Sequence, residues 1–317
     1  MTTFGDMVYQ LGGVPVGSAI GNIGLAGGDV YFVDVANGLS AATGNSPDAA
    51  NNSVLTAYGY TTSAKNDCVI LIASGSAWSP AASLAWANSY THLIGTGVPL
   101  PGEGARARIE AAAGSALTSV LQVSGSGCLF SGLKIDNVAS ADADNGAVIV
   151  TGGRNCFINS MMFGMGHTTP AARAGSYSVN VNGEENYFER CTIGTDTVLR
   201  TAANSELFVR GPRNSFRDCK FASSSITTGK FMVKIVPTID TRSTIFEDCL
   251  FYNYRDDSST KITDCFNIAA GSSRYEVILK GSILLVGITG LGNTLTHIYG
   301  AGAAPNSGMF LGTNPAA

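Results

Sequence analysis

The sequence predicts an all-β chain whose short strands stack as the coils of a parallel β-helix. Three observations predict this fold class. Glycine accounts for 39 of the 317 residues and charged residues for only 13%, a composition typical of short apolar runs joined by turns. A short segment recurs every 28–32 residues between Leu129 and Ser282. An alternating apolar segment, typical of a half-buried strand, precedes each copy.

Each recurring segment begins with an apolar residue and carries a small residue three places later. Since equivalent positions of neighbouring coils stack, we expect an internal aromatic ladder and a small-residue ladder at a tight corner. We interpret the cysteines as small buried hydrophobes rather than nucleophiles or metal ligands. The copies that begin at Leu129 and Ile278 are aligned on Gly132 and Gly281. The central ladder positions are Phe157, Phe188, Phe216 and Phe246, with Ser160, Cys191, Cys219 and Cys249.

The alternating segments predict a second strand in every coil. Most of them end at glycine, as strands do where the chain turns. A more variable connection, including a third strand, is expected to close each coil. The alternating segments are residues 121–125, 148–153, 179–183, 207–211, 233–237 and 266–271.

The pattern divides the chain into four parts. Residues 1–28 form an extended arm, 29–114 an N-terminal cap with the first coils, 115–290 the regular coils, and 291–317 a C-terminal cap and tail. Helix-like stretches occur in 49–63 and 80–90, and one of them is expected to cap the first coil. Residues 68–74 are expected to form the first rung and 283–300 the last rung with its cap. Apolar arm residues assigned to attachment or oligomer contacts are Phe4, Val8, Tyr9, Leu11, Val14 and Val16.

Charge and cysteine usage restrict the classes of partner. The net charge of −4 argues against a nucleic-acid partner, which needs clustered Lys and Arg. No apolar stretch is long enough to span a bilayer, and no signal peptide is visible, so we expect synthesis in a host cytoplasm. Seven cysteines without a CxxC pair predict neither a disulfide framework nor a zinc site. We expect no cofactor and no metal.

The repeat resembles the right-handed parallel β-helices of pectate lyases, polygalacturonases and bacteriophage tailspikes. The resemblance covers residues 115–290 and rests on rungs of the type F-x-[DN]-C-x-F. Residues 30–50 are similar to the segment that opens many such β-helices, frequently in phage virion proteins. Residues 4–17 resemble the start of phage structural proteins. The matching positions of the opening are Tyr31, Val33, Asp34, Asn37, Gly38, Gly44, Ser46 and Pro47.

Candidate catalytic carboxylates come from adjacent rungs. Hydrolysis of a glycoside needs two carboxyl groups flanking the bond, and Asp218 with Asp248 is the best such pair. Both also occupy a corner position, where Asp commonly supports a turn. A second pair, Glu189 with Glu247, is separated by Arg217, an arrangement typical of a surface ion-pair ladder.

Other polar residues suggest weaker sites. The connection around Arg255, Asp256, Asp257, Lys261 and Asp264 suits a solvated loop, a calcium site or part of a glycan groove. The histidines are remote in sequence, without metal-ligand spacing, and no G-x-S-x-G motif is present. They are His92, His167 and His297.

Regular ladders, low charge and the resemblance together favour a structural virion protein of a bacteriophage. We expect it to decorate the capsid exterior through its N-terminal arm, with the capsid protein of the same phage as partner. The resemblance implies a homo-oligomer, a trimer. Two alternatives remain: a tailspike-like depolymerase, which would use Asp218 and Asp248, and a glycan-binding module. The module would stack sugars on Tyr252, Tyr254 and Trp78.

Overall fold

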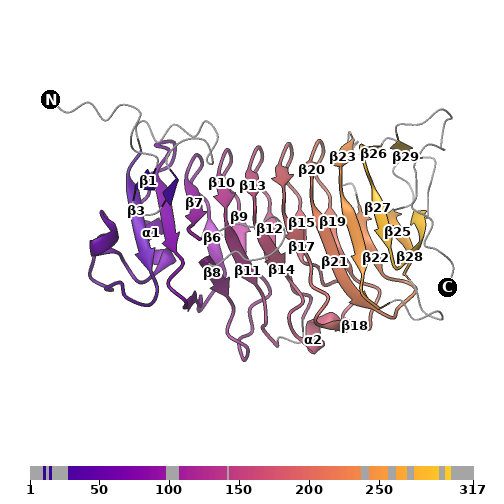
Figure 1. Ribbon diagram of the computed structural model, residues 1–317, viewed down its shortest axis with the longest axis horizontal. Coiled ribbons are helices and arrows are strands. Elements are labelled where there is room, and N and C mark those ends of the chain that lie inside the picture. The colour runs from indigo at the N-terminus through magenta and orange to yellow at the C-terminus, as the bar shows by residue number, and fades with distance from the viewer. Residues whose placement is uncertain are drawn as a thin grey trace.

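The chain forms an elongated solenoid with strand β3 (Val30–Asp34) near one end and strand β29 (Ile298–Gly300) near the other (Figure 1). The computed structural model describes residues 28–97, 107–140, 143–236, 243–255, 262–269, 275–292 and 297–300, and the backbone of 10–11 and 14–15. Three parallel sheets run along the solenoid, and each coil from the one that begins at β4 (Cys68–Ile72) to the one that begins at β26 (Val277–Lys280) contributes a strand to sheet after sheet along this path. The predicted fold class, an all-β parallel β-helix, is confirmed.

We number the sheets I to III in the order in which a coil visits them. Sheet I contains β3 Val30–Asp34, β4 Cys68–Ile72, β7 His92–Gly95, β10 Leu129–Ser131, β13 Cys156–Ile158, β16 Tyr187–Glu189, β20 Ser215–Arg217, β23 Thr244–Glu247, β26 Val277–Lys280 and β29 Ile298–Gly300. Sheet II contains β5 Ala77–Trp78, β8 Ala107–Glu110, β11 Leu133–Asp136, β14 Met161–Phe163, β17 Thr192–Ile193, β21 Lys220–Ser225, β24 Leu250–Asn253 and β27 Leu284–Val286, with β18 Leu199–Arg200 paired to β21. Sheet III contains β6 Leu84–Trp86, β9 Leu121–Val123, β12 Val148–Val150, β15 Val179–Val181, β19 Ser205–Val209, β22 Phe231–Ile235, β25 Ile262–Ile268 and β28 Ile288–Gly292.

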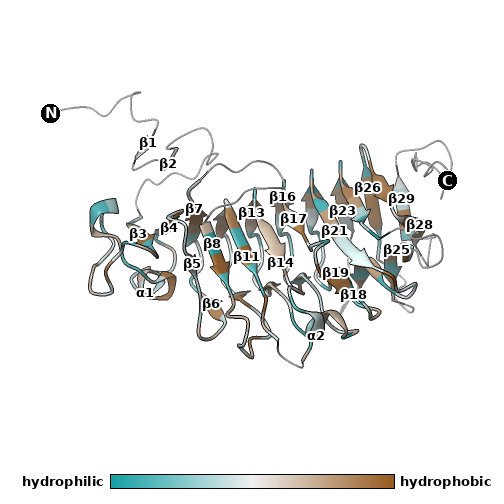
Figure 2. Cartoon of the chain, turned by 60° about the horizontal axis from the view of Figure 1, so that its bottom comes forward, coloured by the Kyte–Doolittle hydropathy of each residue, from teal (hydrophilic) through white to brown (hydrophobic). Residues whose placement is uncertain are grey.

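The six alternating segments predicted as strands all lie in sheet III, in β9, β12, β15, β19, β22 and β25. Their alternation places Val179 and Val181 inside the solenoid, with the residue between them on the outer face. Hydrophobic and hydrophilic positions are interleaved along the strands (Figure 2). The solenoid interior is therefore the hydrophobic core.

An aromatic stack runs through that core from sheet I. Rings of neighbouring coils are nearly parallel, with centroids 4.7 Å apart for Phe157–Phe188 and for Phe188–Phe216, and 5.0 Å apart for Phe216–Phe246. All four predicted ladder residues are fully buried. Phe130 adds one further ring, 4.8 Å from Phe157.

The predicted cysteine ladder lies beside the aromatic stack. Cys191, Cys219 and Cys249 are free and buried, and each thiol contacts a backbone carbonyl of the coil before it. Burial raises the pKa of Cys219 well above its ordinary value, with the neighbouring thiols adding to the effect. These are packing residues with unreactive thiols.

The alignment of the two outer copies of the repeat was wrong by one residue. Sheet I pairs Phe130, not Leu129, with Phe157, and Leu279, not Ile278, with Phe246. Gly132 and Gly281 therefore belong to the corner column, one residue before the small-residue column. That column has positive φ throughout, which glycine accepts without strain. Its members are Gly132, Asn159, Arg190, Asp218, Asp248 and Gly281.

A second turn, from sheet III to sheet I, is built on asparagine and glycine. Asn155, Asn186 and Asn214 lie one above another, and each side-chain oxygen accepts a backbone N–H of the preceding coil at 2.8–2.9 Å. The glycines that end the sheet III segments lie in the same turn. A Cβ atom on Gly152 would lie 1.9 Å from the carbonyl oxygen of Gly125, so the backbones stack too closely for any side chain.

The N-terminal end contains the predicted short helix. Helix α1, Val54–Gly59, begins after Ser53, whose hydroxyl accepts the N–H of Thr56 at 3.3 Å, and it buries Val54 and Ala57. The 3₁₀ turn η1, Pro47–Ala49, precedes it. A third short helix, α2 Thr168–Ala171, lies in a connection from sheet II to sheet III.

Three details of the ends differ from expectation. Residues 80–90 contain strand β6 rather than a helix, because Leu84 and Trp86 alternate into the core. Residues 68–74 are the second rung of sheet I, since β4 pairs with β3 before it. Strands β1 Gln10–Leu11 and β2 Val14–Pro15 pair as an antiparallel hairpin within the predicted extended arm. Arm residues Phe4, Val8, Tyr9 and Val16 lie outside the described residues.

Candidate functional site

The corner carboxylates Asp218 and Asp248 are neighbours on successive coils. The N–H of Asp218 donates to the carbonyl of Glu247 at 2.9 Å, and both residues have φ near +50°. Oδ1 of Asp248 accepts the N–H of Ser282 on the next coil at 2.7 Å. The structure brings the predicted pair together, but it holds both residues by the backbone geometry of a corner. Their column also contains Gly132, Asn159 and Gly281, which shows that the corner does not require a carboxylate.

The alternative pair Glu189 and Glu247 lies on the outer face of sheet I with Arg217 between them. Lys280 continues the column, and its Nζ lies 2.8 Å from Oε1 of Glu247. The predicted alternation of charge is therefore present. The cation that lies between the two carboxylates makes this column an ion-pair ladder on the surface.

Two histidines have local structural partners. Nδ1 of His92 accepts the N–H of Leu129 at 3.1 Å, and burial lowers the pKa of this histidine. Nδ1 of His167 caps helix α2 by accepting the N–H of Thr169 at 3.2 Å. His297 is half-buried at the C-terminal end. The His92 imidazole is 5% exposed and its Nε2 has no partner among the described residues.

The remaining predicted residues separate into surface and core positions. Trp78 is a core residue, 9% exposed, so it is wrong as a sugar-stacking residue. Tyr254 is 62% exposed, and Tyr252 lies on the outer face of sheet II with Lys220 over its ring. Arg255 is exposed and Asp264 is half-buried. The predicted loop residues Asp256, Asp257 and Lys261 lie outside the described residues.

A further carboxylate pair on adjacent coils, missed by the sequence reasoning, lies on the outer face of sheet II. Glu110 and Asp136 are direct cross-strand partners, so their Cα atoms lie on strands about 4.8 Å apart. Lys134 Nζ lies 3.0 Å from Asp136 Oδ2. Burial raises the pKa of Asp136, against the attraction of Lys134 and with a further contribution from Glu110. The signal was a basic-x-acidic pattern at the ends of both strands, Arg108-x-Glu110 and Lys134-x-Asp136.

A buried ionic cluster, also missed, lies at the N-terminal ends of strands in sheet III, beside the two successive connections that carry α2 and β18. Oε1 of Glu206 accepts Arg200 Nε at 3.2 Å and Lys230 Nζ at 3.0 Å, and all three side chains are fully buried. Oε2 of Glu206 accepts the hydroxyl of Ser178 at 2.6 Å. Burial alone would raise the pKa of Glu206, but Lys230 and Arg200 outweigh it and the pKa lies below its ordinary value. The cluster is closed to solvent.

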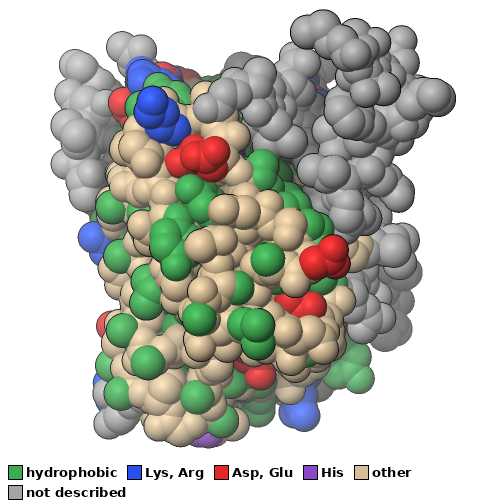
Figure 3. All heavy atoms as spheres, turned by 90° about the vertical axis from the view of Figure 1, so that its left-hand side faces the viewer, with side chains coloured by type: hydrophobic (Ala, Val, Ile, Leu, Met, Phe, Trp, Pro, Cys, Tyr) green, Lys and Arg blue, Asp and Glu red, His purple; other side chains and the backbone are tan. Residues whose placement is uncertain are grey.

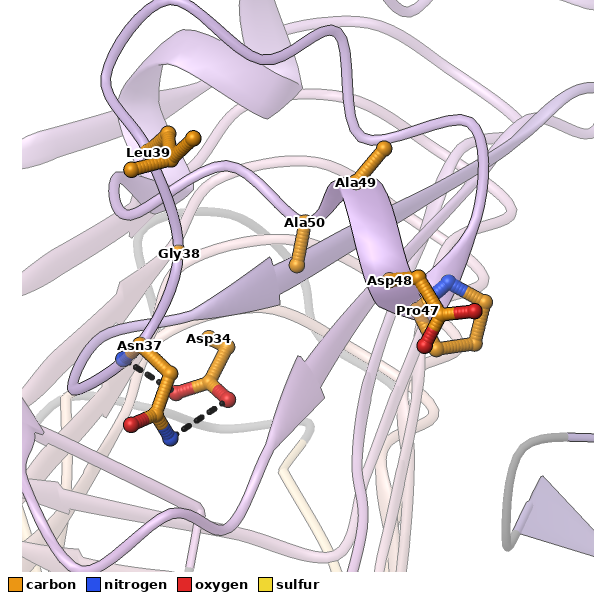
Figure 4. A pocket seen from close by; sticks show the side chains of 8 residues that line it. All are labelled: Asp34, Asn37, Gly38, Leu39, Pro47, Asp48, Ala49 and Ala50. Atoms are coloured by element: carbon orange, nitrogen blue, oxygen red, sulfur yellow. Dashed lines mark hydrogen bonds between the residues drawn. The ribbon is translucent and has the colours of Figure 1, made fainter.

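A surface hollow of about 350 Å³ lies at the N-terminal cap, between residues 34–39 and 47–50. Asp34 and Asn37 face each other there across two hydrogen bonds (Figure 4). Asp34 also accepts the N–H of Ala36, and Ser46 caps the η1 turn. The opening segment at residues 30–50 therefore uses these polar side chains to fold the cap. Gly38 is part of the same cap, where a Cβ atom on it would lie 2.5 Å from each of two backbone carbonyl oxygens.

Neither a metal centre nor a membrane span emerges from the parts that the structure describes. No group of three or more His, Cys, Asp or Glu side chains within those parts is placed to hold a metal ion. None of the described helices has the length and apolar character needed to cross a bilayer.

Comparison with known proteins identifies the fold. No family model matches the sequence, and no curated protein matches it. The solved crystal structure of pectate lyase Pel9A superposes with a TM-score of 0.52 at 12% identity, over 91% of this chain and 81% of that one. The chain therefore has a parallel β-helix fold similar to that of pectate lyase Pel9A. At this identity the likeness concerns the architecture of the solenoid, and the activity of the lyase is not carried over with it.

Proposed function

We propose that this pectate-lyase-like β-helix is a structural protein of a bacteriophage virion, attached to the capsid exterior through its N-terminal end. The observation that carries the proposal is the apolar exterior of that end. The first coils of a solenoid have no need of apolar side chains on their outer faces, because the core is inside. Apolar residues outside the core are typical of contact surfaces.

Sheet I is apolar on its outer face along the first coils. Phe32, Ile70 and Ile94 form one outward column across β3, β4 and β7. They form a cluster separate from the core, but they are only 3–5% exposed, so this column is already covered within the chain and the exposed contact surface lies elsewhere on this end. Further along the sheet the outer face becomes charged, beginning with Glu189. The apolar outer cluster thus starts at the N-terminal end and reaches Ile158 of β13, and the charged column follows it.

The end face of the solenoid adds exposed apolar side chains. Leu39, Leu55 and Tyr60 are 69%, 57% and 43% exposed. Seen end-on, this face carries hydrophobic and uncharged side chains with few charged ones (Figure 3). No Lys or Arg precedes Lys65 in the sequence. A sparsely charged, partly apolar end suits burial against another protein, here the capsid protein or further copies of this chain.

Antibody-gold labelling of purified phage from the source host tests the location. Label spread over the head supports the proposal. Label confined to the tail replaces it with the depolymerase, and particles without label overturn any virion role. Light scattering tests the expected trimer, which a stable monomer at micromolar concentration would exclude.

A triple variant, Leu39→Ser, Leu55→Ser and Tyr60→Ser, tests the attachment surface. We expect it to fold and to lose binding to capsids. Leu284→Ser with Tyr299→Ser is the matched control, since these residues are 47% and 43% exposed at the other end. Equal binding by both variants would contradict attachment through the N-terminal end.

A second candidate function, hydrolysis of a host glycan, is favoured by the Glu110–Asp136 pair. A carboxylic acid with a raised pKa beside a second carboxylate is the pairing that acid catalysis and nucleophilic attack require. Release of reducing ends from host polysaccharide, abolished by Asp136→Asn or Glu110→Gln, would establish it. Activity that survives both variants but not Asp218→Asn with Asp248→Asn would instead place the chemistry at the corner.

A further inference from the structure

The buried ionic cluster at the N-terminal ends of strands in sheet III holds an amine against an amide. Lys230 and Asn204 immediately precede strands β22 and β19, which are neighbours in the sheet, and Ser205 pairs with Phe231. Lys230 Nζ lies 2.8 Å from Oδ1 of Asn204. Lys230 is fully buried and Asn204 is 1% exposed. Water is therefore excluded from the contact between a primary amine and a carboxamide.

A carboxylate is placed on the same nitrogen. Oε1 of Glu206, two residues after Asn204 on β19, lies 3.0 Å from Lys230 Nζ. Arg200 and Ser178 hold the two oxygens of this carboxylate in place. An amine, an amide carbonyl and a proton acceptor thus converge at one atom in a rigid, solvent-free position. Proximity of this kind converts a slow bimolecular reaction into an intramolecular one.

We propose that Lys230 and Asn204 become joined by an isopeptide bond between Nζ and Cγ, with Glu206 as the proton carrier. The bond would form within the folded chain and would link the starts of two neighbouring coils. No oxidant, metal or cofactor is needed, since the reaction exchanges one amide for another.

The atoms of the reaction balance. Glu206 takes one proton from the ammonium group of Lys230, which leaves a neutral amine. The lone pair of Nζ attacks Cγ of Asn204, and the Cγ–Nδ2 bond breaks. Nδ2 receives that proton from Glu206 as the Cγ–Nδ2 bond breaks, and Glu206 then takes the second proton of the attacking nitrogen and passes it to the released ammonia. The products are a secondary amide, an ammonium ion and an ionised Glu206, so that atoms and charge balance.

Two features of the site favour the reacting forms. Burial lowers the pKa of Lys230 to about 8, against the attraction of Glu206 and with help from Arg200, so part of the molecules hold a neutral amine near neutral pH. Nδ2 of Asn204 donates to the carbonyls of Ala171 and Arg173 at 2.8 and 3.3 Å. These contacts fix the plane of the amide and keep its oxygen, rather than its nitrogen, on the side of Lys230.

The bond would clamp the least regular part of the solenoid. The connections that carry α2 and β18 leave the repeating path between sheets II and III, and the cluster lies beside them. A covalent link between residues 26 positions apart would restrict the unfolded chain much as a disulfide does. It would do so without requiring an oxidising compartment.

Mass spectrometry of the purified, denatured full chain tests the proposal. We expect an intact mass lower than the sequence mass by one ammonia, and after proteolysis a branched peptide that joins the segments containing Asn204 and Lys230. The branched peptide is decisive, because succinimide formation at an Asn-Gly pair such as Asn182-Gly183 causes the same mass loss without joining two peptides. Unmodified peptides containing Asn204 and Lys230 would overturn the proposal.

Variants assign the roles. Lys230→Met and Glu206→Gln should restore the full mass and remove the branched peptide. Lys234→Met is the matched control, since Lys234 lies four residues later on the outer face of the same strand, over Phe208, and it should retain the branched peptide. If the buried variants do not fold, the peptide map of the unaltered chain still decides the outcome.

Discussion

Oδ1 of Asn186 accepts the backbone N–H of Asn155 at 2.9 Å, so the side chain of one coil completes the turn of the coil before it. Asn214 repeats the contact with Asn186 at 2.8 Å, and its Nδ2 donates to the carbonyls of Gly183 and Gly211. These contacts contribute to stability because the backbone groups are buried. A buried group that loses its partner cannot form a hydrogen bond with water instead. The asparagine ladder is therefore a main determinant of coil stacking.

Replacing Asn214 with alanine should destabilise the solenoid strongly. The change leaves one buried N–H and two buried carbonyls without their partner, at about 1–3 kcal/mol for each unsatisfied group. We expect a loss of at least about 2 kcal/mol in the free energy of unfolding, measured by urea denaturation. Asn182→Ala is the control, because Oδ1 of Asn182 has no partner in the described structure. Equal losses in the two variants would refute a special role for the ladder.

Glycine in the same turn is required by the distance between backbones. A Cβ atom on Gly152 would lie 1.9 Å from Gly125 O and 2.8 Å from Ser124 O, and neither atom can move without shifting its coil. Gly152→Ala should therefore cost about 3 kcal/mol or more, as overpacking against backbone does. At Gly114 a Cβ meets nothing within 4 Å. Gly114→Ala should be neutral or stabilising by about 0.5 kcal/mol, because alanine restricts the unfolded chain. A thermal scan of both variants measures the contrast.

The sequence was sufficient for the repeating part of the molecule because stacked coils place like residues at like positions. The Phe and Cys columns could be predicted from spacing alone, and so could the corner occupied by Asp218 and Asp248. The asparagine ladder was also periodic, two residues before Phe157, Phe188 and Phe216, and was overlooked. The one-residue error at Leu129 and Ile278 arose because a glycine fits either the small-residue column or the positive-φ corner. Only backbone pairing separates the two.

The candidate sites were harder to predict because they depend on irregular connections. Arg200, Glu206 and Lys230 converge only because β18 leaves the repeating path and brings Arg200 to Glu206. No spacing rule relates these three residues. Glu110 and Asp136 meet because β8 and β11 pair in register. The same register pairs Ile109 with Ile135, and both of these side chains lie in the core.

The corner role of Asp218 can be separated from a catalytic one by stability measurements. Asp218 has φ of +50°, a conformation that Asn tolerates and β-branched residues do not. Asp218→Asn should change the free energy of unfolding by less than about 0.5 kcal/mol, whereas Asp218→Val should cost about 1–3 kcal/mol through backbone strain. Chemical denaturation of the two variants provides the test. A large loss in the Asn variant would mean that the carboxylate itself, rather than the corner conformation, has been selected.

Asp136 should make the stability of the chain depend on pH in a defined direction. Burial and Glu110 raise its pKa in the folded state, while the unfolded chain keeps the ordinary value of about 3.9. Between the two values the folded state holds more protons than the unfolded state, so this residue lowers stability as pH rises through that window. The variant Asp136→Asn does not titrate. Urea denaturation from pH 3 to 7 should therefore show the stability of the variant rising relative to the unaltered chain, and levelling off above the folded pKa.

Lys134→Met removes the cation that opposes the shift in the pKa of Asp136 and should extend the window to higher pH. A stability difference that stays constant with pH, or falls, would mean that Asp136 is ionised in the fold as readily as in the unfolded chain.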